Sequence, residues 1–228
     1  HDVTVEGTVN STFDDAAGVC GLVNAAAGAK ITNCVNKANV KSTGNYIGGI
    51  AGWSDSGNAN ELVFDNCTNE GSIAGKTMVG GVCGTLRSGT VINSKNSGDV
   101  IGNCSTGGIV GYGLGGTVKG SSNSGSVTAT ETNGDVYYIK GTKGSFGANY
   151  NNGTGGICGW AQNITISDCK NSGTMKAQNK VGGISGSCYW SNISNCENTG
   201  RIVATHWGVA GGILGWGMTV ANIRDCVN

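Results

Sequence analysis

Proline is absent from this 228-residue chain, and charged residues make up only 12% of it. Without proline or a Gly-X-Y period, the chain cannot be collagen-like. No apolar run reaches the roughly 18 residues that a membrane-spanning helix needs, so we expect no membrane insertion. The 14 basic and 14 acidic residues balance. Because nucleic-acid-binding surfaces are strongly basic, we expect no nucleic-acid partner.

Glycine and asparagine are abundant instead, with 43 and 26 residues. Both are poor helix formers, so long helices are not expected. Hydrophobic residues still make up 38% of the chain. That share is enough to build a core, which argues against a disordered chain.

A Gly-Gly-apolar-x-Gly motif recurs along the chain. Six copies begin at Gly48, Gly80, Gly107, Gly155, Gly182 and Gly211, and Ala17–Gly21 is a degenerate seventh copy. A second motif follows each copy, with Cys or Ser two residues before an Asn. The Cys/Ser position lies 13 residues after the second glycine in four copies, and the next second glycine lies 14 residues further on in three. The basic unit therefore has 27 residues.

Each unit contains three short apolar–polar stretches bounded by Gly and Asn, which is typical of short strands between turns. One such unit cannot bury its own apolar face, whereas stacked units bury a continuous core. The sequence therefore predicts an all-β fold, a parallel β-helix or β-solenoid of about seven 27-residue coils. We expect residues 1–228 to form a single domain with one long inserted loop at about 128–152, as a fragment of a larger surface protein.

The repeated asparagine of the second motif has a predicted structural role. Asn tolerates tight turns, and its amide can pair with the same amide in the coils above and below. We therefore expect an asparagine ladder at one corner of the solenoid. Its members would be Asn36, Asn69, Asn96, Asn123, Asn171 and Asn198, with Asn228 in the last copy.

The ten cysteines fall mostly into two columns of the repeat. Cys34, Cys67, Cys169, Cys196 and Cys226 share the Cys/Ser position, and Cys20, Cys83 and Cys158 precede the last glycine of the first motif. Interchange with Ser, Ala and Val predicts small, semi-buried, reduced thiols. The alternative is disulfides between adjacent coils, as in Cys34–Cys67 and Cys169–Cys196. Because no Cys-x-x-Cys occurs, we expect no metal site and no cofactor.

The two motifs resemble the GLUG-type repeat of large bacterial surface and secreted proteins. Val79–Gly84 together with Asn93–Val100, and their equivalent copies, carry this resemblance over nearly the whole chain outside the insertion. The resemblance implies an extracellular location, at the bacterial cell surface or secreted. Such repeats occur beside IgA-protease-like peptidases and in candidate adhesins, but this chain contains no His-Glu-x-x-His motif.

No catalytic residues are predicted. Asp65, Asp168 and Asp225 lie near positions where Asn also occurs, which indicates corner residues of turns. No carboxylate pair of the kind that a glycoside hydrolase uses stands out. The chain has only two histidines, and neither is near a distinctive serine, so a Ser-His-Asp triad is not expected.

Two features predict a binding surface. The position after the first motif is aromatic in four copies, Trp53, Tyr112, Trp160 and Trp216, and stacking would align them as an exposed stripe for sugar rings or a protein partner. Alternatively, these rings pack over the Gly-rich corner and shield the backbone. The insertion concentrates Tyr137, Tyr138, Lys140 and Tyr150. It is either a second contact surface or a flap that covers one coil.

The function expected from these features is a non-catalytic, cell-surface or secreted module for binding or adhesion. Its expected partner is a glycan or a host or bacterial surface protein. The alternatives are a polysaccharide-processing β-helix enzyme, a lyase or glycoside hydrolase, and a purely structural stalk. Because an uncapped solenoid end invites strand pairing, end-to-end contacts are also expected.

Overall fold

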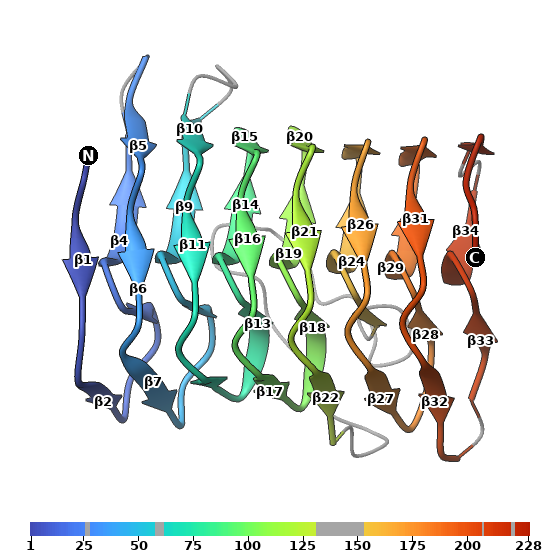
Figure 1. The fold of residues 1–228 in the computed structure, drawn as a ribbon, viewed down its shortest axis with the longest axis horizontal. Coiled ribbons are helices and arrows are strands. Elements are labelled where there is room, and N and C mark those ends of the chain that lie inside the picture. Colours follow the sequence, from blue (N-terminus) through green and yellow to red (C-terminus); the bar gives the residue numbers. More distant parts are fainter. Residues whose placement is uncertain (26–27, 58–61, 131–152, 207, 220–221) are drawn as a thin grey trace.

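The chain folds as a β-solenoid in a computed structural model that describes residues 1–25, 28–57, 62–130, 153–206, 208–219 and 222–228. Seven coils stack along one axis, and the first and last coils lie at opposite ends (Figure 1). The described residues form short strands and no helix, and hence contain no candidate for a membrane-spanning helix. The prediction of an all-β parallel solenoid of about seven coils is confirmed.

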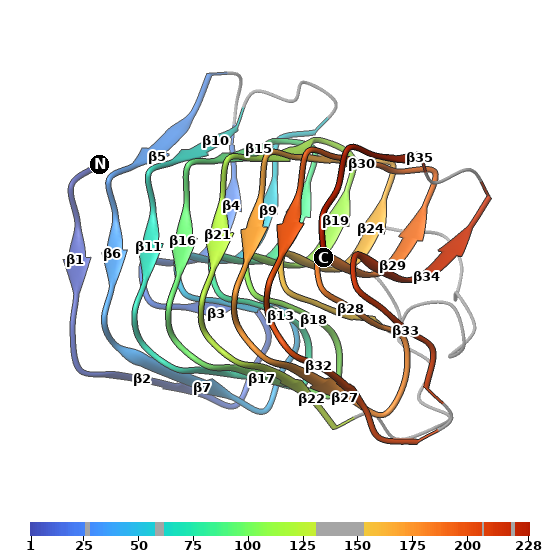
Figure 2. The same ribbon diagram turned by 45° about the vertical axis from the view of Figure 1, so that its right-hand side comes forward.

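Equivalent strands of successive coils pair in parallel and form five sheets, which we number I to V in chain order. Figures 1 and 2 show these equivalent strands side by side along the axis. Each coil thus has five strands, where the sequence predicted three. The additional strands were missed because sheet I strands have only two residues, too few to show an alternating pattern, and because a bend at the Gly-Gly pair divides one stretch between sheets III and IV.

Sheets I and II follow one another around the corner at which the repeated asparagines lie. Sheet I contains β1 (Thr4–Val5), β6 (Val35–Asn36), β11 (Thr68–Asn69), β16 (Lys95–Asn96), β21 (Ser122–Asn123), β26 (Lys170–Asn171) and β31 (Glu197–Asn198). Sheet II contains β2 (Thr8–Ser11), β7 (Asn39–Ser42), β12 (Ile73–Ala74), β17 (Val100–Gly102), β22 (Val127–Ala129), β27 (Met175–Ala177) and β32 (Ile202–Ala204).

Sheets III, IV and V complete each coil. Sheet III contains β3 (Ala16–Ala17), β8 (Ile47–Gly48), β13 (Thr77–Gly80), β18 (Cys104–Gly107), β23 (Thr154–Gly155), β28 (Val181–Gly182) and β33 (Ala210–Gly211). Sheet IV contains β4 (Cys20–Asn24), β9 (Ala51–Asp55), β14 (Cys83–Arg87), β19 (Val110–Leu114), β24 (Cys158–Gln162), β29 (Ser185–Tyr189) and β34 (Leu214–Met218). Sheet V contains β5 (Lys30–Thr32), β10 (Val63–Asp65), β15 (Thr90–Ile92), β20 (Thr117–Lys119), β25 (Thr165–Ser167), β30 (Asn192–Ser194) and β35 (Asn222–Arg224).

The interior holds two apolar cores that run along the axis. The larger core is built mainly from sheets IV and V and includes Phe64, Leu86 and Ile166. The smaller core lies between sheets II and III and includes Val100 and Val127. Because these apolar positions repeat in every coil, burial continues from one coil to the next, as the repeat requires.

The second glycine of each pair lies against the repeated asparagine that follows it in the sequence, at the start of the next coil. A Cβ atom added at Gly108 would overlap both the side chain of Asn123 and the carbonyl oxygen of Gly156. The second glycines of the other coils, from Gly18 to Gly212, face the asparagine that follows them in the same way. The two sequence motifs are therefore the two sides of one close contact, which explains why they recur together.

The insertion does not disturb the pairing of the coils on either side of it. Gly107 pairs with Gly155, and Asn123 pairs with Asn171, across the inserted segment. Most of the predicted loop at about 128–152 lies outside the described residues.

Candidate functional site

The repeated asparagines form a continuous ladder that is buried from Asn36 to Asn198. Each side-chain amide nitrogen donates to the amide oxygen of the next asparagine along the axis. The six Nδ2–Oδ1 distances, from Asn36 through Asn69, Asn96, Asn123, Asn171 and Asn198 to Asn228, are 2.7 or 2.8 Å. The same nitrogen of the first six also donates to the carbonyl two residues later, as Asn96 does to Gly98 at 2.8 Å. The ladder thus gives hydrogen-bond partners to polar groups that burial would otherwise leave unpaired.

All amides of the ladder point the same way. Oxygens face the N-terminal end and nitrogens face the C-terminal end, because every donor belongs to the earlier coil. The series begins at Asn36, since the equivalent position of the first coil is Val5. The amide oxygen of Asn36 is consequently buried without a hydrogen-bond partner.

This buried acceptor yields a stability prediction. Val5→Asn should add a donor next to the Asn36 oxygen and raise the free energy of unfolding by about 1 kcal/mol. Val5→Leu, which has a similar size but no amide, serves as the matched control and should not stabilise the protein. Urea denaturation followed by circular dichroism measures both variants. Equal stability of Val5→Asn and Val5→Leu would contradict the prediction.

All ten cysteines are free thiols in the structure. In the Cys/Ser column each side chain donates to the carbonyl two residues earlier, as Cys169 does to Ser167 at 3.1 Å and Ser94 does to Ile92 at 3.0 Å. Cys34, Cys67, Ser121, Cys196 and Cys226 make the equivalent contact. A thiol and a hydroxyl can both make this bond in the same space, which explains the interchange of Cys with Ser.

Burial shifts the titration of several of these thiols. It raises the pKa of Cys67 to about 11 and that of Cys188 to about 12, and it also raises the pKa of Cys83 and Cys158. Only the thiolate is a strong nucleophile, so these groups are suited to packing and not to chemistry at neutral pH.

The raised thiol pKa values predict a loss of stability in alkali. Above pH 9, the ordinary thiol value, the unfolded chain releases protons that the folded chain retains. The free energy of unfolding should therefore fall by about 1 kcal/mol per pH unit for each such thiol between pH 9 and 11. Urea titrations at pH 8, 9, 10 and 11 measure this slope. Cys67→Ser introduces the residue type found in two other coils and should make the fall in stability with pH less steep. An equal slope in both proteins would refute the contribution of the Cys67 thiol.

The predicted aromatic stripe is in register but is not exposed. Tyr112 pairs with Trp160 in sheet IV, and Trp53 and Trp216 occupy the same column. Trp53, Tyr112 and Trp160 are only 5%, 1% and 3% exposed, and Trp216 is half-buried. The expectation of an open surface of these rings is therefore corrected.

The rings are buried because residues at or just before the start of the sheet III strands pack against them. Tyr46 packs edge-on against Trp53 with 4.9 Å between ring centroids, and Met78 belongs to the same cluster. Lys180 places its Nζ 4.5 Å from the centre of the Trp216 ring. Tyr46, Met78 and Lys180 all adopt positive φ angles, which turn the chain back toward sheet IV.

The rings also contact one another within this cluster. Tyr112 and Trp160 stack with centroids 4.4 Å apart, and the Tyr112 hydroxyl bonds to Gln162 Oε1 at 3.0 Å. This arrangement matches the alternative in which the rings cover the Gly-rich backbone. The four insertion residues predicted to bind, Tyr137, Tyr138, Lys140 and Tyr150, lie outside the described residues.

The acidic corner residues behave mostly as turn residues. Asp168 and Asp225 have φ angles of 57° and 53°, in the left-handed region, while Asp65 ends strand β10. Within the described part of the chain, no group of three or more His, Cys, Asp and Glu residues could hold a metal ion.

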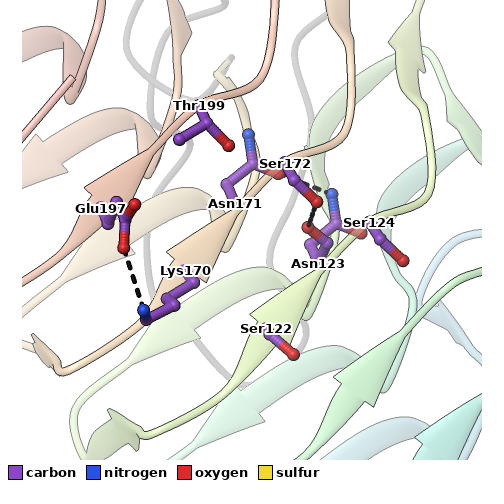
Figure 3. Close-up of a pocket in the computed structure, with 8 residues that line it drawn as sticks. All are labelled: Ser122, Asn123, Ser124, Lys170, Asn171, Ser172, Glu197 and Thr199. Atoms are coloured by element: carbon purple, nitrogen blue, oxygen red, sulfur yellow. Dashed lines mark hydrogen bonds and ion pairs between the residues drawn. The ribbon is translucent and has the colours of Figure 1, made fainter.

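A polar groove of about 280 Å³ runs beside the ladder on the outer face of sheet I (Figure 3). We call it the ladder groove. It is lined by Ser122, Asn123, Ser124, Lys170, Asn171, Ser172, Glu197 and Thr199. Lys170 and Glu197 form an ion pair across neighbouring coils at 3.0 Å, and their side chains remain exposed.

The chemistry of the ladder groove suits binding better than catalysis. The ladder amides of Asn123 and Asn171 are engaged with each other and with Asn198, so hydroxyl groups and the ion pair are what the groove offers. Among its described lining residues, Glu197 is the single carboxylate, whereas glycoside hydrolysis uses two. The groove leaves no signal in the sequence, because its residues become neighbours only when coils stack.

One unit of the repeat matches a known family motif. Residues 150–175, which contain the Gly155–Gly159 motif, match the model of the GLUG motif. The chain carries a GLUG-type repeat. The GLUG match spans one coil, and the coils on either side pair with it in register. No curated protein sequence matches the chain significantly.

Among solved structures, the chain is similar to a protein described as a "putative immunoglobulin A1 protease" from Bacteroides ovatus. The two share 17% sequence identity and a TM-score of 0.56 over 97% of this chain. The alignment covers 66% of that protein, slightly less than two thirds of its length. At this identity the similarity shows the shared fold.

Proposed function

We propose that this GLUG-repeat chain is a non-catalytic module for binding or adhesion at the bacterial cell surface or in secreted form. It contacts a glycan or a surface protein. The observation that carries the proposal is the ladder groove, in which exposed hydroxyl groups and the Lys170–Glu197 ion pair are held at fixed spacing by the buried ladder. Rigid presentation of polar groups lowers the entropic cost of binding.

The groove is tested with the purified chain on a glycan array and on intact epithelial cells. We expect binding to at least one of these, and a Lys170→Ala/Ser172→Ala variant should lose most of it. Lys95→Ala is the matched control, because Lys95 lies in the same column of sheet I but does not line the groove. If the groove variant binds as well as the unmodified chain, the ladder groove is not part of the contact surface. Absence of binding by the unmodified chain would favour a structural stalk.

The insertion is the second proposed contact surface. Its Tyr137, Tyr138, Lys140 and Tyr150 supply aromatic area and one positive charge. A chain in which residues 131–150 are replaced by a short Gly-Ser linker tests this contribution in the same assays.

Catalysis is tested directly. The fold relative's description concerns proteolysis of immunoglobulin A1, so immunoglobulin A1 is the first substrate to incubate with the chain. We expect it to remain intact on gel electrophoresis, as should a pool of plant and bacterial polysaccharides. Cleavage of either would overturn the non-catalytic proposal.

A further inference from the structure

An aromatic pair, with Trp190 exposed and Tyr189 half-buried, lies at the corner between sheets IV and V. Tyr189 ends β29 and Trp190 follows it, with ring centroids 4.2 Å apart at 37°. Trp190 is 50% exposed. The pair is separate from the buried stripe, and neither residue was among the predicted binding residues.

Neither backbone preference nor packing accounts for a tryptophan at this corner. Trp190 has a φ of 48°, and the same corner is occupied by Ser88, Gly115, Asn163 and Thr219, which also have positive φ. A bulky residue is disfavoured in this region. Its half-exposed ring also gains little from core burial. Strained residues of this kind concentrate at binding and catalytic sites.

A polar groove begins two residues beyond Trp190. It measures about 730 Å³ and crosses the last strands of sheet V. Its lining consists of Thr165, Asn192, Ile193, Ser194, Asn222, Ile223 and Arg224. Asn222 donates to Asn192 at 2.9 Å, which fixes the two amides in one row. Arg224 is exposed and is the one charged residue among the described lining.

We propose that the Tyr189–Trp190 pair and this groove form a site for an oligosaccharide, with a sugar ring stacked on Trp190. A sugar ring presents an apolar C–H face and a rim of hydroxyl groups, which match an aromatic face and a row of amide and hydroxyl side chains. Arg224 adds a donor for an acidic sugar or for further hydroxyls. The inference rests on the proposed binding function and deepens it by naming a glycan and a third contact site.

The test uses Trp190→Asn. Asn occupies the same corner at position 163 with a φ of 52°, so the variant should fold and melt no lower than the unmodified chain. Phe13→Ala is the matched control, since Phe13 is an aromatic residue that is 79% exposed at another corner. On a glycan array followed by titration with the bound oligosaccharides, Trp190→Asn should weaken binding at least tenfold and Phe13→Ala should not. Arg224→Ala should reduce binding of acidic oligosaccharides more than that of neutral ones.

Binding to intact epithelial cells is measured before and after periodate oxidation of their glycans. This comparison distinguishes failure of the oligosaccharide site from failure of the proposed binding function. Loss of cell binding after oxidation, together with the Trp190→Asn defect, supports the oligosaccharide site. Cell binding that survives oxidation overturns the site and leaves adhesion to a surface protein. Equal glycan affinity of Trp190→Asn and the unmodified chain also overturns it. Absence of binding to cells and glycans alike rejects both the site and the proposed function.

Discussion

Asn123→Ala is expected to lower the free energy of unfolding by about 3–5 kcal/mol, because it interrupts the ladder at its centre. Asn123 accepts a hydrogen bond from Asn96 and donates to Asn171 and to the Gly125 carbonyl. Truncation leaves the Asn171 oxygen and one Asn96 hydrogen buried without partners. Each buried polar group left unpaired costs about 1–3 kcal/mol, and the loss also breaks a chain of mutually polarised amides.

Urea denaturation followed by circular dichroism measures the effect of Asn123→Ala. Asn10→Ala is the matched control, because Asn10 is exposed on β2, and it should change the stability by less than about 0.5 kcal/mol. A loss below about 1 kcal/mol for Asn123→Ala would show that water or a rearranged neighbour replaces the ladder contacts.

Gly108→Ala is expected to cost more than about 4 kcal/mol or to prevent the central coils from stacking. The added methyl group would overlap the Asn123 side chain on one side and the Gly156 backbone on the other. Backbone atoms on the facing coil cannot move aside without breaking the parallel pairing of β19 with β24. The penalty therefore arises from overpacking, since Gly108 does not have a positive φ.

Soluble yield, circular dichroism and urea denaturation detect this defect. Gly7→Ala is the control, because Gly7 has a φ of 94° but open space around its Cβ position, and only the conformational cost of about 1–2 kcal/mol applies. If Gly108→Ala does not fold, Gly108→Ala/Asn123→Ala still tests the contact. The double variant should regain soluble yield relative to Gly108→Ala, because removal of the Asn123 side chain relieves one of the two overlaps. A Gly108→Ala protein as stable as Gly7→Ala would refute the contact.

The coil number and the ladder were predictable because a repeat reduces the fold to one dimension. Once the 27-residue spacing aligns Asn69 with Asn96 and Asn123, parallel stacking follows from hydrogen bonding between neighbours alone. The insertion could be recognised for the same reason, since coils on either side stay in register. The five-strand cross-section was not predictable from period, because strands of two residues carry no periodic signal.

The exposure of side chains could not be predicted from the repeat spacing. Trp53 and Trp160 were placed in the correct column, yet their burial depends on Tyr46, Met78 and neighbouring residues folding back over sheet IV. Those residues show no turn signature, because Tyr and Met are uncommon at positive φ. Trp190 lies off that stripe, yet its column is also a regular corner of the solenoid.

The common orientation of the ladder amides makes the two ends of the rod chemically different. The amide oxygen of Asn36 is covered by the first coil, where Val5 takes the place of an asparagine. At the opposite end of the series, Asn228 accepts a hydrogen bond from Asn198 and turns its amide nitrogen away from the other asparagines. A further coil could therefore extend the ladder by hydrogen bonding on the Asn228 side, whereas an apolar side chain closes the Asn36 side.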